Sequence, residues 1–132
     1  MSDCIDIKMY YEDTDCGGVV YYGKYLGYLE RARTEYLEDR KVSLVALMKD
    51  GVHFVVVNVD INYKTPAKYG DVLAVCSEVV DMTNATITFG HKIFKKATET
   101  VVATASVKLA CIGKNMRPKR ISSAIVNALR AD

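Results

Sequence analysis

One segment of this chain has the hydrophobic period of a helix, and the segments around it have the period of strands. Between residues 21 and 41, apolar side chains recur at steps of three and four, which predicts an amphipathic helix of about five turns. Elsewhere apolar and polar side chains alternate, which predicts strands over residues 3–12, 55–63, 71–82, 85–96 and 100–112. The last four strands follow one another without a crossover helix, so they should pair antiparallel. The sequence therefore predicts an α+β fold, with a five-stranded antiparallel sheet wrapped around one long helix.

Capping residues predict two shorter helices. Ser43 is placed to cap a helix over residues 43–50 that stops at Gly51, and Ser122 is placed to cap a helix near the C-terminal end. No linker, repeat or low-complexity tract divides the sequence, and 132 residues can bury the core of one domain. We therefore expect a single domain over residues 1–132.

The charge and the cysteines narrow the class of protein. With 18 basic and 16 acidic residues, the net charge of +2 is too small for the electrostatic footprint of a nucleic-acid-binding protein. No apolar run approaches the roughly 20 residues that span a bilayer, and the charged N-terminal segment does not resemble a signal peptide. We expect a cytoplasmic protein with no transmembrane segment, no metal site and reduced thiols at its four cysteines, which are Cys4, Cys16, Cys76 and Cys111.

The segment over residues 10–25, YYEDTDCGGVVYYGKY, joins the first strand to the long helix and holds the polar chemistry. Asp13 and Asp15 precede a pair of glycines that ends at Gly18, and glycine permits close backbone approach. The entrance of a helix also offers free N–H groups that can polarise a carbonyl. An EF-hand calcium loop is excluded, because the twelfth position counted from Asp13 is Lys24 instead of Glu. Two interpretations remain: an acidic turn that hydrogen-bonds its own backbone, and a catalytic carboxylate.

Two blocks of the sequence resemble the signature of the hotdog-fold acyl-CoA thioesterases. The first, EDTDCGGVVYYGKYLGYLERARTEYL, is similar to the pattern D-x-D-x-x-G-V-V-Y followed by a helix with Y-x-E-x-A-R, here YLERAR. The second, VDINYKTPAKYGDVLAV over residues 59–75, resembles the family's Y-x-x-P-A-x-x-G-D. The chain thus looks like a member of the 4-hydroxybenzoyl-CoA thioesterase-like superfamily, in particular its bacterial branch associated with the Tol-Pal system. This resemblance implies the hotdog fold, in which the sheet encloses the long helix.

The resemblance also implies the reaction, which is hydrolysis of an acyl-CoA to a carboxylic acid and free coenzyme A without a cofactor. By position, the family's catalytic carboxylate falls on Asp15, as general base for water or as nucleophile on the thioester carbonyl. The backbone N–H of Tyr22 would bond the thioester oxygen, and Gly18 would let the loop pass close to the substrate. Many members of this branch have His at the position of Tyr22, so this chain departs from the pattern there.

Other residues are candidates for binding the substrate. Lys92, Lys95 and Lys96 could bind the phosphates of coenzyme A, although such cations are often only solvated. Tyr25 could line an acyl channel. The thiol carrier could be coenzyme A or an acyl carrier protein.

Several alternatives are weighed against this interpretation. A hotdog hydroxyacyl thioester dehydratase would use a histidine, and the segment 21–41 has none. An acyl-thioester-binding or interaction module without catalysis would keep the fold alone. Cys16 is expected to fill space rather than act as a nucleophile, and His91 to be a satisfied histidine. Finally, one helix cannot cover a five-stranded sheet with two open edges, which predicts a dimer or a tetramer.

Overall fold

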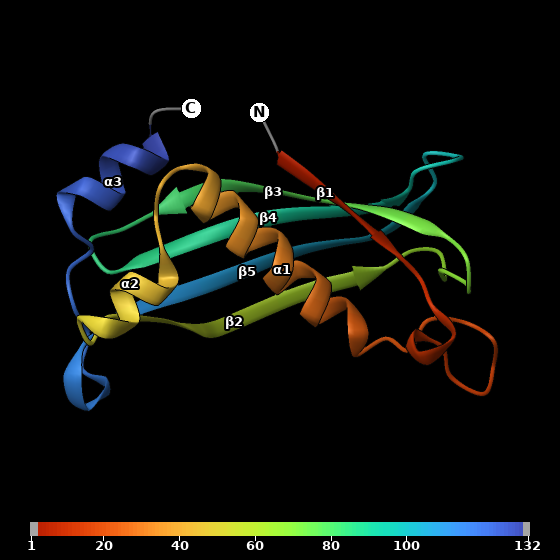
Figure 1. The fold of residues 1–132 in the computed structure, drawn as a ribbon, viewed down its shortest axis with the longest axis horizontal. Helices are drawn as coiled ribbons and strands as arrows, with labels where there is room; N and C mark the ends of the chain where they lie inside the picture. The colour runs from red at the N-terminus through yellow and green to blue at the C-terminus, as the bar shows by residue number, and fades with distance from the viewer. Residues whose placement is uncertain (1–2, 131–132) are drawn as a thin grey trace.

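A five-stranded sheet carries a single long helix across one face (Figure 1). The structure is a computed structural model that describes residues 3–130. The strands are β1 (Asp3–Lys8), β2 (His53–Tyr63), β3 (Val72–Met82), β4 (Thr86–Lys95) and β5 (Val101–Ile112). They lie in the order β1-β3-β4-β5-β2, and every neighbouring pair is antiparallel. The predicted α+β architecture is therefore confirmed.

The helices follow their predicted positions with shorter bounds. They are α1 (Lys24–Asp39), α2 (Leu44–Lys49) and α3 (Ser123–Arg130), together with the 3-10 turns η1 (Tyr11–Asp13) and η2 (Lys114–Met116). The central helix begins three residues later than predicted, because Tyr21 is still in extended pairing and donates its N–H to the Asp13 carbonyl at 2.9 Å. The predicted caps are present, since Ser43 Oγ accepts from the Ala46 N–H and Ser122 Oγ accepts from the Ile125 N–H.

The hydrophobic core lies between α1 and the sheet. The buried side chains of α1 are Tyr25, Tyr28, Leu29, Ala32, Arg33, Tyr36 and Leu37. Tyr22 and Leu26, which the helical period assigned to the apolar face, are instead 63% and 45% exposed. Tyr22 precedes α1 by two residues, and Leu26 lies in its first turn. Among residues 3–130, no helix is long and apolar enough to cross a membrane.

A buried polar cluster interrupts this core. Arg33, only 8% exposed, donates through Nη1 to Nε2 of His91 at 3.4 Å. The other ring nitrogen of His91 lies 3.1 Å from both Ser77 Oγ and the Cys76 carbonyl oxygen. His91 is therefore a satisfied core histidine, as its position beside Phe89 on β4 predicted.

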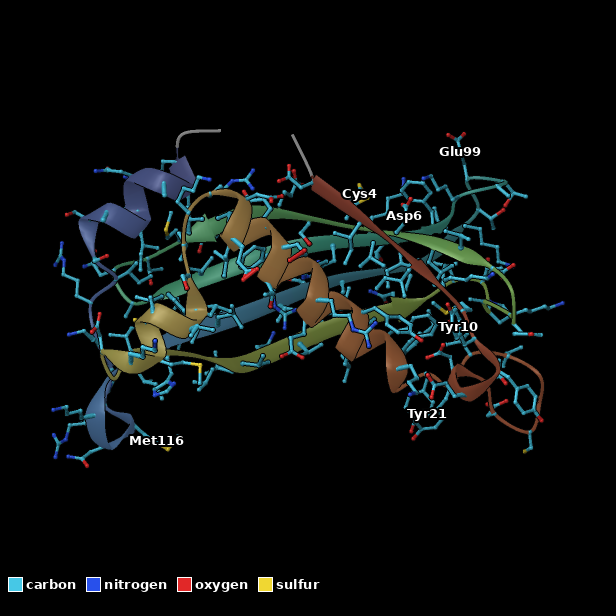
Figure 2. All side chains as sticks on the ribbon, in the orientation of Figure 1. Cys4, Asp6, Tyr10, Tyr21, Glu99 and Met116 are labelled. Carbon is cyan, nitrogen blue, oxygen red and sulfur yellow. A yellow bond between two sulfur atoms is a disulfide. The ribbon has the colours of Figure 1, made fainter. Side chains whose placement is uncertain are left out.

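The prediction of four reduced thiols is wrong for two of the cysteines. Cys4 on β1 and Cys76 on β3 face each other in the antiparallel register and form a disulfide, which joins positions 72 residues apart. Figure 2 shows Cys4 near the start of β1. Cys16 and Cys111 are free. Spacing along the sequence does not reveal such a pair, because only the strand register brings the two residues together.

Candidate active site

The segment between η1 and α1 folds into a small hairpin. The Asp15 N–H donates to the Val19 carbonyl at 2.9 Å, and the Gly18 N–H donates back to the Asp15 carbonyl at 3.1 Å. Gly18 has φ of +82°, the left-handed conformation that closes a three-residue hairpin loop and favours glycine. Asp15 is therefore held at the last hydrogen-bonded pair before the tip. The hairpin lies at the end of the sheet away from α3 (Figure 1).

Asp15 presents an exposed carboxylate with one free oxygen. Its Oδ1 accepts from the Gly17 N–H at 2.8 Å, which fixes the side chain over the turn. Within residues 3–130, Oδ2 has no hydrogen-bond partner, so it is open to water or to a substrate. A side chain at position 17 would place its Cβ 3.2 Å from Oδ1, and glycine avoids this contact. The tip of the hairpin is thus shaped around this carboxylate.

Asp13, by contrast, is occupied on both oxygens. Oδ2 accepts from the Tyr10 N–H and Oδ1 from the Tyr28 hydroxyl, each at 2.8 Å, and the Lys24 ammonium lies 3.9 Å away. Burial, followed by the hydrogen bond to Asp13, raises the pKa of Tyr28 above its ordinary value. The two carboxylates, between which only the family resemblance could choose, therefore differ in structure: both oxygens of Asp13 are occupied, and Asp15 has one oxygen available. Sequence reasoning missed Tyr28, although it is the tyrosine of the YLERAR block.

The entrance of α1 offers the predicted backbone donor. In the part of the chain that the structure describes, the Tyr22 N–H has no acceptor, whereas the Tyr22 carbonyl accepts from the Tyr25 N–H at 3.3 Å and the Tyr63 hydroxyl at 3.4 Å. Tyr22 lies one residue before the N-cap Gly23, so its free N–H is beside the positive end of the helix dipole and can bond a developing oxyanion. Tyr10 and Tyr21, which flank the hairpin, both lie near this end of α1 (Figure 2).

The second sequence block packs directly against the hairpin. The Val20 N–H donates to the Ala67 carbonyl at 2.8 Å, and Val19 pairs with Lys68. Tyr25, predicted as a substrate contact, is 3% exposed, and its hydroxyl accepts from the Ala67 N–H at 3.3 Å. The two blocks that define the family resemblance are therefore in contact, and Tyr25 joins α1 to both of them.

The candidate lysines differ in their partners. Lys95 Nζ lies 3.4 Å from Asp71 of the second block, and Lys96 forms an ion pair with Asp6. Lys92 has no ion pair among residues 3–130, and its ammonium lies 5.7 Å from the centre of the Phe94 ring. Two of the three predicted phosphate contacts are thus paired with carboxylates in this structure.

An apolar groove of about 450 Å³ runs along α1 beside the edge of the sheet. It starts at Leu26, about one turn after Tyr22, and its apolar lining includes Leu29, Phe54, Val56 and Val59. Glu30 and Arg33 add a polar band to its wall. Sequence reasoning missed this groove, because its lining comes from α1, α2, β2 and β5, and the hydrophobic period of each element does not reveal how they are placed relative to one another. Within residues 3–130, no group of three or more potential ligands is arranged to hold a metal ion.

Comparison with known proteins identifies the family of the chain. Residues 11–129 match the model of the thioesterase-like superfamily. The chain is 37% identical to the acyl-CoA thioester hydrolase YbgC of Escherichia coli over 91% of this chain and 90% of that protein. It is 40% identical to the acyl-CoA thioesterase YbgC of Haemophilus influenzae over 80% and 77% of the two chains.

A solved structure shows the same fold. The crystal structure of a 1,4-dihydroxy-2-naphthoyl-CoA thioesterase from Synechocystis superposes with a TM-score of 0.92 at 21% identity, over 99% of this chain and 97% of that one. This likeness confirms the predicted hotdog fold, and the YbgC relatives are consistent with the predicted bacterial branch. From the family match and these relatives, we conclude that the chain belongs to the thioesterase-like superfamily.

Proposed function

We propose that this protein is an acyl-CoA thioester hydrolase in which Asp15 is the catalytic carboxylate. The observation that carries the proposal is the free Oδ2 of an exposed aspartate, held at a hairpin tip beside a helix entrance with a free N–H. The YbgC relatives, named for acyl-CoA thioester hydrolysis, support the same activity. The absence of histidine from the hairpin and from α1 weighs against a hydroxyacyl thioester dehydratase.

Two routes use the same carboxylate. As a general base, Asp15 takes a proton from water, the water oxygen attacks the thioester carbon, and the C–S bond breaks as the proton passes to the departing sulfur. As a nucleophile, Asp15 Oδ2 attacks that carbon to form a mixed anhydride and release the thiolate, and water then cleaves the anhydride. In both routes the Tyr22 N–H bonds the carbonyl oxygen as negative charge develops on it. Gly18 keeps the hairpin tip free of a side chain where the thioester approaches. The proposed chemistry needs no metal or redox cofactor.

The groove beside α1 is the proposed site for the acyl group, since its lining is mainly apolar and includes Leu26, four residues after Tyr22. Coenzyme A is the proposed thiol carrier, although an acyl carrier protein thioester presents the same reacting atoms. Lys92 is free of ion pairs within residues 3–130, so it is the lysine best placed to bind a phosphate without giving up a partner. Lys95 and Lys96 would exchange Asp71 and Asp6 for phosphate oxygens.

We also propose that the enzyme is at least a dimer. Strand β2 is an edge strand, and its exposed apolar side chains include Val56, Val57 and Val59. Pairing of β2 with the same strand of a second copy would cover these side chains and close the open side of the acyl groove. A tetramer of two such dimers would use the sheet faces or the helices.

A cytoplasmic location is proposed because acyl-CoA thioesters are metabolic intermediates inside the cell. The Cys4–Cys76 disulfide is unusual for that compartment, which makes the redox state of this pair a direct test of the location.

The decisive experiment is a panel of acyl-CoA and acyl carrier protein thioesters assayed for thiol release. Asp15→Asn should fold normally and lose about 10²- to 10⁴-fold in kcat, because the amide can neither accept a proton nor attack. Asp81→Asn, at an exposed aspartate on β3, is the matched control and should keep wild-type turnover. Near-full turnover in Asp15→Asn would overturn the catalytic assignment. Binding without thiol release by the wild type, across the whole panel, would identify a non-catalytic acyl-thioester module.

A further inference from the structure

We propose that Asp13 is a positioning residue, which together with the hydroxyl of Tyr28 fixes the Asp15 hairpin against helix α1. The inference rests on the catalytic role proposed above for Asp15. It is based on the contacts of Asp13. Its side chain and its carbonyl group contact the segment before the hairpin, the segment after the hairpin, and the first two turns of α1.

Asp13 ties together both ends of the hairpin. Its Oδ2 accepts from the Tyr10 N–H at 2.8 Å, and its carbonyl oxygen accepts from the Tyr21 N–H at 2.9 Å. These residues are the last before η1 and the first after the returning strand of the hairpin. Because Asp15 lies only two residues from Asp13, a shift at this point moves the catalytic carboxylate with it.

The same side chain attaches the hairpin to the helix. Asp13 Oδ1 accepts from the Tyr28 hydroxyl at 2.8 Å, and the Lys24 ammonium lies 3.9 Å from the same oxygen. Tyr28 is 2% exposed, so its position is set by the core, and the Asp13 side chain retains only 14% of its accessible surface. A hydrogen bond between a buried phenol and a largely buried carboxylate is among the stronger polar contacts of a protein.

A second set of hydrogen bonds connects the other strand of the hairpin to the same part of α1. The Val20 N–H donates to the Ala67 carbonyl, and the Ala67 N–H donates to the Tyr25 hydroxyl. The Tyr25 and Tyr28 rings pack edge to face, with centroids 5.9 Å apart. Both strands of the hairpin are thus fixed to one pair of tyrosines, which lies within the first turns of the helix whose entrance supplies the Tyr22 N–H.

This arrangement couples the position of the carboxylate to the position of the oxyanion donor. A thioester must contact both at once, and a misplacement of about 1 Å in such a site can lower turnover about 100-fold. Asn at position 13 cannot replace Asp, because its single carbonyl oxygen cannot accept from both the Tyr10 N–H and the Tyr28 hydroxyl, and the negative charge beside Lys24 is lost. Phe at position 28 removes the helix attachment while leaving every carboxylate in place.

The test uses three variants of the full-length protein: Asp13→Asn, Tyr28→Phe and the double variant that carries both changes. Asp15→Asn is the reference for loss of the catalytic carboxylate. We expect the first two variants to lower kcat about 10- to 100-fold with KM changed less than about twofold, because substrate binding is retained while the reacting groups are displaced. The double variant should lose little more than Asp13→Asn alone, because both changes act on one contact. The pH–rate profiles of Asp13→Asn and Tyr28→Phe should keep the acid limb of the wild type.

The control is Asp3→Asn, which alters a side-chain contact as short as that between Asp13 and Tyr28, the 2.7 Å ion pair of Asp3 with Arg40 at the other end of α1. It should change thermal stability without changing kcat. Wild-type kcat in Asp13→Asn and Tyr28→Phe, with Asp15→Asn inactive, would overturn the positioning role and leave the proposed function intact. Loss of the acid limb of the pH–rate profile in Asp13→Asn would also overturn the positioning role, because Asp13 would then be the general base. Full activity of Asp15→Asn would overturn both this proposal and the proposed function. If Asp13→Asn does not fold, Tyr28→Phe decides alone.

Discussion

Nε2 of His91 accepts a hydrogen bond from the buried guanidinium of Arg33 at 3.4 Å, so this ring nitrogen carries no proton. The proton of the neutral ring therefore sits on Nδ1, which lies 3.1 Å from the Cys76 carbonyl oxygen. Burial first, and the charge of Arg33 second, lower the pKa of His91 from 6.5 to about 4. The core between α1 and β4 thus holds one permanent cation and one histidine that the fold keeps neutral.

The first prediction concerns stability in acid. The unfolded chain takes up a proton at position 91 near pH 6.5, whereas the folded chain does so only near pH 4. The unfolded state therefore binds more protons between these values, and the free energy of unfolding falls as the pH drops through this window. Between pH 7.5 and pH 4.5 this residue should remove about 2 kcal/mol.

Urea unfolding at several pH values measures this loss. His91→Gln should show a shallower fall in the free energy of unfolding than the wild type. His53→Gln, at the exposed histidine of β2, should follow the wild type. Equal pH dependence in His91→Gln and the wild type would show that His91 does not carry this linkage.

The second prediction concerns the disulfide. Denatured, unreduced protein should titrate two free thiols, from Cys16 and Cys111. The Cys4–Cys76 bond spans 72 residues, so its reduction should lower the free energy of unfolding by about 4 kcal/mol in the chain-entropy model. A reductant should therefore lower the urea midpoint of the wild type and leave the Cys4→Ala/Cys76→Ala variant unchanged. Four titratable thiols in freshly purified protein would contradict the prediction.

The third prediction concerns the tip of the hairpin. Gly17→Ala places a methyl group 3.2 Å from Asp15 Oδ1, which is closer than an ordinary contact, so the carboxylate must shift by a few tenths of an ångström from its position over the turn. We expect kcat to fall about 10-fold with little change in melting temperature, since a small displacement of a reacting group is costly and the tip is exposed. Cys16→Ala is the matched control at the same tip and should keep wild-type turnover. Loss of activity in Cys16→Ala, with an acyl group trapped on the wild-type thiol, would instead make Cys16 the nucleophile.

The sequence predicted the features that depend on local pattern. Alternation located the strands, the capping serines located α2 and α3, and the motif spacing singled out Asp15. Without the family resemblance, the residues alone could not separate Asp13 from Asp15, because the structural difference lies in the hydroxyl of Tyr28, which α1 brings from 15 residues away. The Cys4–Cys76 bond and the Arg33–His91 contact were also missed, because each depends on register or packing between elements distant in sequence.

The last prediction concerns assembly, and it follows from an asymmetry between the two edges of the sheet. Edge strand β1 has six residues, whereas edge strand β2 has eleven. Strand β2 pairs with β5 on one side only, so half of its backbone donors and acceptors face outward, and Val57 lies at a break in its register with β5. A long, apolar, unpaired edge strand is a template for pairing with another chain, which the protein should satisfy by pairing with itself.

Light scattering at assay concentrations should therefore give a mass of at least twice 14.7 kDa. Val57→Lys should reduce the mass to that of one chain, because it places like charges together where the two β2 strands meet. Val80→Lys is the matched control, since Val57 and Val80 are each 55% exposed but Val80 lies on the interior strand β3, and it should leave at least the dimer. Turnover should fall with the mass in Val57→Lys, because the open side of the acyl groove loses its cover. A wild-type protein that is fully active as a single 14.7-kDa chain would refute the shared interface.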